Sequence, residues 1–364
     1  MPGFNGQLRS NEIFSSLYNM IISQQVFADN IAGTNARLME MNRVDGSLYG
    51  DTKLYYATDV LESKPWGNDA EATNLLQLHR PKAPDVQAIH LDQFRQISLT
   101  VDNYLSKRAW GTEGAFSEFN SVMLGWIRET KRVYDSTLFN SYVGTAQSTV
   151  GRQNITITLP EQTGDTEATN RLQAQAIAEG VANLLVDMTD VTRDFNDYGN
   201  LRSYSEEDLI IVWNSDFLNK IKKVDLPTIF HNDNLIQKLG DYVLPARYFG
   251  TVNTAGGTAP ASNSTVRSLI ETDYEVSEVV THVFPGDLLP AGATYTANTT
   301  YTVDATIMFK VMYRRSVPFM SAFEVGTSFF NPKSLTENHY LTWGYNTLEY
   351  LKNYPFVTVR GQAS

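Results

Sequence analysis

The 364-residue chain carries 42% hydrophobic residues and no cysteine, so it can bury a large core but has no disulfide, thiolate metal site or thiol nucleophile. Its formal net charge of −11 argues against a general nucleic-acid binder, because phosphate contacts require a surplus of Lys and Arg on one face. The first residues lack a basic segment followed by a long apolar run, so we expect neither a secretory signal nor a membrane span. We therefore expect the protein to be made and folded in a cytoplasm.

Residues 1–50 are expected to form an N-terminal arm. Within residues 11–27 the apolar positions recur at spacings of three and four, which predicts an amphipathic helix with Phe14 and Tyr18 on its apolar stripe. Residues 28–50 show no such period. The stripe needs a partner on the same chain or on another copy, so Phe14 and Tyr18 are candidate inter-subunit contacts.

Residues 51–101 predict an extended β-loop. Apolar and polar residues alternate over residues 53–61 and again over residues 96–101, as in two strands with unlike faces. Prolines near both ends of the segment between the two strands indicate an irregular, exposed tip. A two-stranded ribbon of this length is marginal in water unless something covers it, and a neighbouring copy is one candidate for that cover.

The tip of this loop supplies three further candidate contacts, Lys64, Trp66 and Arg80. A large aromatic side chain on an exposed tip is often an anchor in a partner's pocket, which favours a contact between Trp66 and another copy. The alternative is that Trp66 folds back onto the leucines at residues 75–78.

Two long helices follow. Thr112 is a predicted N-cap with Glu113 in the first turn, and the helix that they begin is expected to end near Gly144. Apolar side chains form one broad face of this helix, so we expect it to lie against a sheet. A second helical period runs over residues 165–195. The members of the first face are Phe116, Phe119, Met123, Trp126, Ile127, Val133, Tyr134 and Leu138.

The rest of the chain is mostly β-patterned. Residues 208–213 are short, branched and apolar, as expected of a buried strand. Residues 251–265 are rich in small and polar residues and predict a surface loop. Alternation over residues 303–313 predicts a strand with one apolar face, and residues 354–360 predict a final strand in the core.

Four aspartates recur every three or four residues at the predicted end of the second helix, where the helix dipole disfavours carboxylates. One interpretation is a stripe that meets Lys or Arg of a neighbouring copy, or a divalent cation, near a symmetry axis. The other is a solvated face with Arg193 as its local counter-ion. The four are Asp187, Asp190, Asp194 and Asp197.

The sequence offers no local support for catalysis. The five histidines are scattered, with no pair at metal-ligand spacing, and no phosphate-binding, nucleophile-elbow or metalloprotease motif occurs. We therefore predict no catalytic residues, no metal site and no cofactor. An acidic intracellular hydrolase remains the enzymatic alternative, and it would use Asp187, Asp190 or His231.

The order of these elements, with Asp102-Asn-Tyr-Leu-Ser-Lys after the β-loop and a closing strand after Trp343-Gly-Tyr, resembles tailed-bacteriophage major capsid proteins. The resemblance implies the α+β Hong Kong 97-like major capsid fold, with an extended β-loop and a long spine helix. It also implies that the chain is divided into five parts. These are an N-terminal arm (1–50), the extended β-loop (51–101), a peripheral domain with the spine helix (102–165), an axial domain (166–250) and a β-rich return that completes both domains (251–364).

The resemblance further implies a function as a major capsid protein. Copies would form hexamers and pentamers that tile an icosahedral shell around double-stranded DNA, without sequence-specific binding to that DNA and without a membrane. A separate scaffolding protein and a portal would be partners, and the shell would be assembled in the host cytoplasm. Two alternatives remain open: an encapsulin-type compartment shell that encloses a cargo enzyme, and a tail or other virion structural protein.

Overall fold

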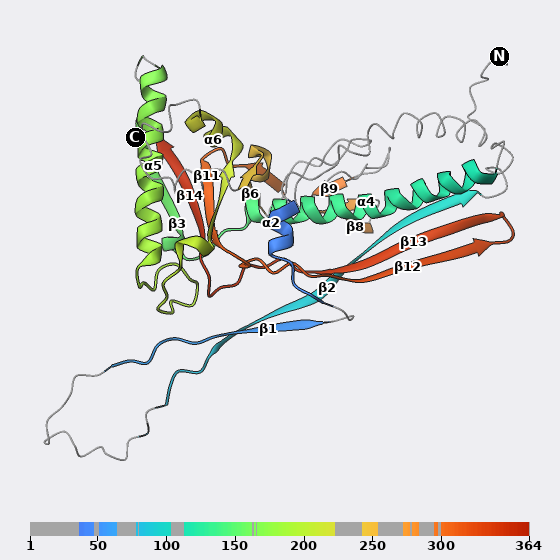
Figure 1. Ribbon diagram of the computed structural model, residues 1–364, viewed down its shortest axis with the longest axis horizontal. Coiled ribbons are helices and arrows are strands. Elements are labelled where there is room, and N and C mark those ends of the chain that lie inside the picture. The colour runs from blue at the N-terminus through green and yellow to red at the C-terminus, as the bar shows by residue number, and fades with distance from the viewer. Residues whose placement is uncertain are drawn as a thin grey trace, which may run out of the picture. The chain divides into compact units, whose positions relative to one another are not determined.

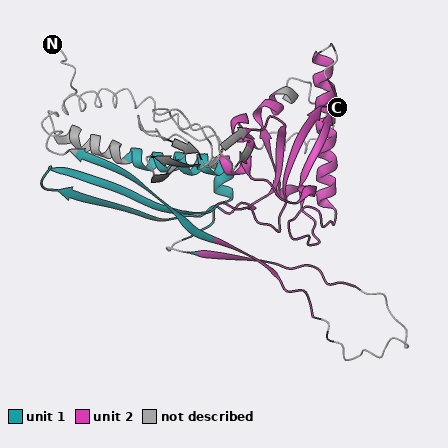
Figure 2. Ribbon diagram, turned by 180° about the vertical axis from the view of Figure 1, so that it is seen from behind, with its two compact units in different colours: residues 1–51, 90–140, 319–347 teal, residues 52–89, 141–318, 348–364 magenta. Residues whose placement is uncertain are grey.

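The computed structural model consists of two compact units (Figure 2). Unit 1 comprises residues 1–51, 90–140 and 319–347, and unit 2 comprises residues 52–89, 141–318 and 348–364. The strand β2 (Asp85–Asp102) and the helix α4 (Glu113–Thr145) each continue from one unit into the other. The described residues are 36–46, 51–63, 78, 80–102, 113–161, 164, 166–222, 242–253, 272–276, 279–283, 295–297 and 300–363.

Several predictions concern residues outside these ranges. They are the N-terminal helix with Phe14 and Tyr18, the tip residues Lys64 and Trp66, the N-cap residue Thr112, His231, and most of the predicted loop at 251–265.

Unit 2 is built on a five-stranded mixed sheet of order β3-β14-β11-β4-β5 (Figure 1). The outer pairs, β14 with β3 and β4 with β5, are parallel, and β11 pairs antiparallel with both β14 and β4. The two predicted core strands, at 208–213 and 354–360, are confirmed as β4 and β14, and all six residues of β4 are buried. The bounds are β3 (Asn154–Leu159), β4 (Leu209–Asn214), β5 (Tyr242–Leu244), β11 (Ile307–Tyr313) and β14 (Phe356–Ala363).

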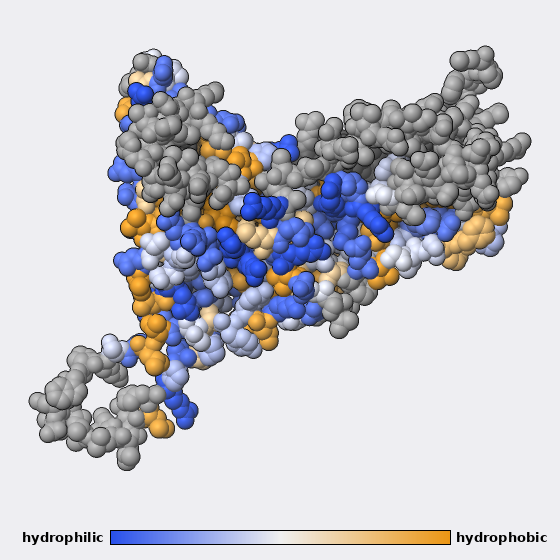
Figure 3. Space-filling view, in the orientation of Figure 1, coloured by the Kyte–Doolittle hydropathy of each residue, from blue (hydrophilic) through white to orange (hydrophobic). Residues whose placement is uncertain are grey.

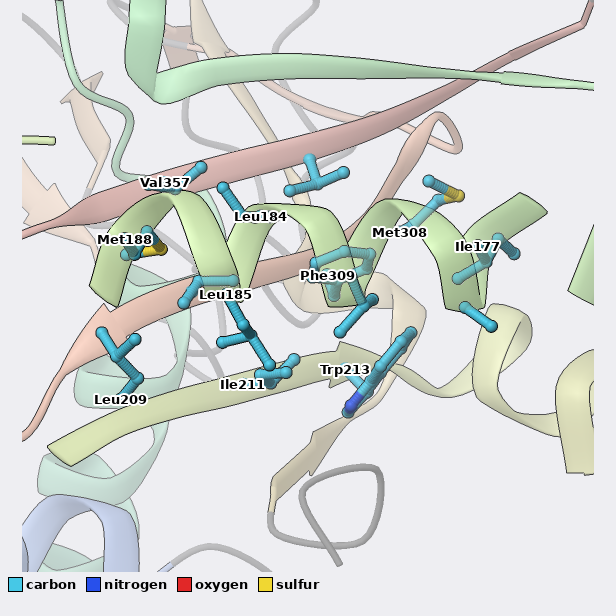
Figure 4. Close-up of a cluster of buried hydrophobic side chains, with 14 of the residues drawn as sticks. Ile177, Leu184, Leu185, Met188, Leu209, Ile211, Trp213, Met308, Phe309 and Val357 are labelled. Atoms are coloured by element: carbon cyan, nitrogen blue, oxygen red, sulfur yellow. The ribbon is translucent and has the colours of Figure 1, made fainter. Parts of the chain in front are cut away.

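The helix α5 (Thr166–Thr189) covers this sheet and supplies the core of unit 2. Its buried side chains recur at spacings of three and four and point at the strands (Figure 4). Trp213 and Phe309, both fully buried, pack with their ring centroids 4.6 Å apart. The labelled core residues from the helix are Ile177, Leu184, Leu185 and Met188.

The second helix is shorter than predicted. It ends at Thr189 rather than near Phe195, because the chain turns there and Thr192 forms an isolated antiparallel bridge with Arg202. Apolar residues beyond the turn, such as Phe195, belong to the same core, which explains why the apolar period continues past the end of the helix.

The predicted apolar face is present in β11, where Ile307, Phe309 and Val311 are buried. The opposite face is buried as well, and Lys310 lies fully buried in its middle. The strand begins at Ile307, and both of its faces are covered, as expected inside a layered sheet. The Lys310 ammonium donates to the Ala146 carbonyl and lies 5.4 Å from the centroid of the Phe356 ring. Burial, with a smaller contribution from the Arg360 charge, lowers the pKa of Lys310 well below its usual range.

Shorter elements complete unit 2. They are the helix α6 (Ser215–Lys222), the 3₁₀ turns η3 (Gly151–Gln153), η4 (Glu206–Asp208) and η5 (Ala246–Tyr248), and two small sheets. The first small sheet pairs β6 (Gly250–Asn253) with β10 (Thr300–Val303). The second has the order β8-β7-β9, with β7 (Thr272–Val276), β8 (Val279–Val283) and β9 (Tyr295–Ala297).

Three strands of a second sheet lie largely in unit 1: β2, β13 (Thr336–Asn346) and β12 (Ser321–Asn331). Including β1 (Thr52–Ala57), the order is β1-β2-β13-β12, so that β12 is an edge strand. β13 pairs antiparallel with both of its neighbours. A short helix, α2 (Ala36–Met41), contributes the buried Leu38 to the core of this unit.

The long helix predicted from 113 is confirmed as α4, and from residue 125 on, where burial is described, the predicted apolar face is only partly buried. Ile127, Asp135 and Phe139 are buried at spacings that are multiples of four, whereas Val133 is exposed and Trp126 is only half-buried. Phe139 packs edge-on against Phe319, with 5.9 Å between the ring centroids.

The helix ends near Gly144, as predicted, and this glycine also permits a close approach of another backbone segment. The helix continues to Thr145, and a Cβ atom at position 144 would lie 1.9 Å from the carbonyl oxygen of Tyr248. Any larger residue would therefore displace η5 from the end of α4.

Candidate assembly surface

The strand β1 presents its apolar face to solvent. Leu54 is 52% exposed and Tyr56 is 64% exposed, whereas Lys53, Tyr55 and Ala57 on the opposite face are half-buried or buried. Burial, with a smaller contribution from the Tyr354 phenol, raises the pKa of Tyr55. The alternation predicted from the sequence is therefore present, with its more hydrophobic side turned outward.

Exposed apolar residues continue along both legs of the extended β-loop (Figure 3). Leu61 and Leu78 are the most exposed of them, at 77% and 78%. Single exposed apolar residues are ordinary, but a series of them along one projection is typical of an interaction surface. We call this series the arm surface: Leu54, Tyr56, Val60, Leu61, Leu78 and Val86.

The first leg leaves β1 earlier than predicted. The strand ends at Ala57 instead of Leu61, because the next residues bond to a loop of unit 2. The Asp59 carboxylate accepts from Arg193 Nη1 at 2.6 Å and from the Leu201 amide at 2.9 Å, and Arg202 donates to the Thr58 carbonyl. Chiefly the Arg193 hydrogen bond lowers the pKa of Asp59 to about 2.

A second apolar surface lies at the β12–β13 hairpin in unit 1. Phe329 is 62% exposed, and Val325, Phe330 and Leu335 are also exposed. We call these four residues the hairpin surface. Leu335 has a positive φ of 55°, an uncommon conformation for a leucine, at the turn that ends the hairpin.

Sequence reasoning missed the hairpin surface, although a signal for it was present. Phe329 and Phe330 are consecutive residues of a strand, so their side chains point to opposite faces of the sheet. A sheet with one covered face must then expose one of the two phenylalanines. Both are exposed, because neither face of β12 is covered over residues 324–330.

The four aspartates do not form one stripe. Asp187 and Asp190 are exposed at the end of α5, but Asp194 pairs with Arg152 and Asp197 accepts hydrogen bonds from other segments of unit 2. Arg193 is not their counter-ion, because it bonds to Asp59. The prediction of a helical stripe is wrong because the helix ends at Thr189, before Asp190.

Of the predicted tip residues, Arg80 is described and is exposed. Within the described ranges, no three His, Asp or Glu side chains gather as metal ligands would. No helix in the described part of the chain is long and apolar enough to cross a membrane.

Asp135 is a buried carboxylate on α4 that gives unit 1 a testable pH dependence. It accepts from Ser321 Oγ at 3.2 Å and lies 3.9 Å from Lys131 Nζ, which also pairs with Glu324 at 2.8 Å. Burial outweighs the opposing effect of Lys131 and raises the pKa of Asp135 from 3.8 to about 6.

Because the folded chain binds this proton more tightly than the unfolded chain, the free energy of unfolding should fall as pH rises from about 4 to about 6. By pH 7 this loss amounts to about 3 kcal/mol relative to pH values below about 4. Asp135→Asn should therefore lose less stability than the wild type between pH 4.5 and pH 7, as measured by urea unfolding of the unassembled chain. Equal losses in the two proteins would contradict the assignment.

The comparisons with known proteins point to one family. The family model of the Phi29-like phage major capsid protein matches residues 5–357. A search of curated proteins finds no match for the sequence.

Solved structures share the fold at low sequence identity. A chain from the capsid structure of Staphylococcus phage Andhra superposes with a TM-score of 0.57 at 10% identity, covering 88% of this chain and 83% of that one. A chain from a structure of the head fiber and inner core protein gp22 of native bacteriophage P68 gives a TM-score of 0.63 at 9% identity, covering 89% and 84%. The mixed helix and sheet architecture is thus that of Hong Kong 97-like phage capsids, as the resemblance implied.

Proposed function

Because the chain belongs to the family of Phi29-like phage major capsid proteins, we propose that its copies form hexamers and pentamers that tile an icosahedral shell around double-stranded DNA. Membership of the family makes it a shell-forming capsid protein of the virion, which associates with itself. Its role is structural, and assembly takes place in the host cytoplasm with a scaffolding protein and a portal as partners.

The arm surface is the observation that carries the proposed mode of assembly. It is an apolar series on a projection, and a ribbon of two strands has little core of its own. In the assembled shell, residues 51–101 lie over an adjacent copy, which covers the arm surface. Each contact is modest, but every copy both gives and receives one, and the contacts sum around the closed shell.

Other contacts extend this interface. The hairpin surface offers a second apolar patch to a neighbouring copy. Asp187 and Asp190 are free to meet basic residues of an adjacent subunit near a symmetry axis, and Arg80 carries a positive charge on the arm. Lys64, Trp66, Phe14 and Tyr18 complete the proposed contacts. Asp194 and Asp197 are not among the proposed contacts, because Asp194 pairs with Arg152 and Asp197 accepts a hydrogen bond from Gln153 of the same chain.

The parts of the chain follow the same proposal. Residues 1–50 are an N-terminal arm, residues 102–165 hold the spine helix in a peripheral domain, residues 166–250 form the axial domain and residues 251–364 complete both. The charge of −11 suits a wall that encloses DNA without trapping it.

Negative-stain microscopy of the expressed chain, with and without a co-expressed scaffolding protein, tests the proposal. We expect closed shells of uniform size with the scaffolding protein, and DNA rather than a protein cargo in particles from infected cells. Open tubes or small rings alone would favour a tail protein, and particles filled with one enzyme would favour a compartment shell. Either result would overturn the proposal.

A further inference from the structure

At their base, both legs of the extended β-loop form hydrogen bonds with other segments of unit 2. Residues 52–89 all belong to this unit (Figure 2). On the first leg, the Asp59 carboxylate accepts hydrogen bonds from Arg193 and from the Leu201 amide. The Thr58 carbonyl accepts a hydrogen bond from Arg202. These bonds connect the outgoing leg to the loop at 192–202.

The returning leg is held by one buried side chain, Gln87, which is 7% exposed. Its amide nitrogen donates to the Tyr350 carbonyl at 3.0 Å and to Glu349 Oε2 at 3.2 Å, and its amide oxygen accepts from the Lys352 amide at 3.0 Å. These three side-chain hydrogen bonds of Gln87 are all made to residues 349–352.

The two receiving segments are joined to each other through Asp197. The Asp197 amide donates to the Lys352 carbonyl at 2.7 Å, and Tyr350 Oη donates to Asp197 Oδ2 at 2.6 Å. Gln153 Nε2 and Ser148 Oγ donate to Asp197 Oδ1 at 2.6 and 2.7 Å, which ties the same carboxylate to the segment after α4. The outgoing and returning legs are therefore fixed to one connected polar network.

We propose that Asp59 and Gln87 are positioning residues for assembly, which fix the direction in which the loop leaves unit 2 before a neighbouring copy binds it. The inference rests on the proposed function, in which the loop covers an adjacent copy. A loop that is ordered in advance loses less conformational entropy when it docks, and all copies present the arm surface in the same direction. Without the two residues the loop would swing about its base, and subunits would join at variable angles.

The Leu201 and Lys352 amides report on this arrangement directly, because each donates to one of the two positioning residues. The test uses the full-length chain with Asp59→Ala and Gln87→Leu combined, kept unassembled at low concentration. Hydrogen exchange at these two amides should become at least fivefold faster than in the wild type. With a scaffolding protein present, microscopy should show a severalfold lower yield of closed shells and more irregular particles.

The matched control is Asp85→Ala combined with Gln96→Leu. Asp85 makes an exposed ion pair with Lys82, and Gln96 donates to Thr342 Oγ1. The control therefore removes the same groups from the same loop and leaves the hydrogen bonds of Asp59 and Gln87 in place. It should leave exchange at both amides and the yield of shells unchanged. If the double variant does not fold, Asp59→Ala alone is tested at the Leu201 amide.

Unchanged exchange at Leu201 and Lys352 would overturn the fixed base. Faster exchange with a normal yield of regular shells would overturn its role in assembly. Neither result would overturn the proposed function, which fails if the wild-type chain forms only open tubes or small rings, or particles filled with one enzyme.

Discussion

The double variant Leu54→Asp and Tyr56→Asp is expected to stay folded but to form no closed shells. Both side chains are exposed in the single chain, so aspartate should change the stability of the unassembled protein by no more than about 0.5 kcal/mol each. In a docked interface, however, each substitution loses about 1.5–3 kcal/mol of apolar burial and adds the desolvation cost of a charge. The loss recurs at every copy, so the effect on the shell is large.

Sedimentation velocity and electron microscopy with a co-expressed scaffolding protein measure this effect. The control variant combines Leu54→Met with Tyr56→Phe, which keeps the apolar area and adds no charge, and it should assemble like the wild type. Normal shells from the aspartate variant would show that the arm surface is not an interface.

Phe309→Ala is expected to have the largest effect on stability. The ring is fully buried in unit 2 between α5 and the sheet and packs against Trp213 (Figure 4). Its removal loses apolar burial and leaves a cavity, which together cost about 3–5 kcal/mol. Since a domain of this kind is stable by about 5–15 kcal/mol, the variant should be close to unfolding at physiological temperature.

Urea unfolding of the unassembled chain, followed by circular dichroism, measures the change. Leu172→Ala is the matched control, because Leu172 lies on the exposed side of α5 and should cost no more than about 0.5 kcal/mol. A cost below about 1 kcal/mol for Phe309→Ala would mean that the packing of this core is different from that described.

The elements of unit 2 were predictable because their patterns are local. The run at 208–213 is too apolar and too branched for anything but a buried strand, and the closing segment at 354–360 has the same character. The long helix from 113, most of which lies in unit 1, is likewise predicted by its apolar period. These signals depend on neighbours in the sequence, so one chain is enough to find them.

Other features depend on residues that are far apart in the sequence. From the sequence alone, Lys310 is expected to face solvent. In the structure its strand lies between β14 and β4. Asp59 and Gln87 look like ordinary polar residues of a strand, because their partners lie more than 130 and 260 residues away. The aspartate series looked like a helical stripe because its spacing persists through a turn that a period cannot detect.

The arm surface could be predicted from the sequence only in part. The alternation over residues 53–61 was visible in the sequence, but which of the two faces would be buried was not, since each carries a tyrosine. The structure turns Tyr55 inward and Tyr56 outward. Apolar patterning usually marks the inner face of a strand, and its reversal here is the observation behind the proposed contact with another copy.

A cryo-electron microscopy map of the assembled shell is the most direct measurement of this account. We predict that side chains of an adjacent copy lie within about 4.5 Å of Leu54 and Tyr56, which then lose most of their exposure. A shell in which both residues still face solvent, or are covered only by their own chain, would contradict it.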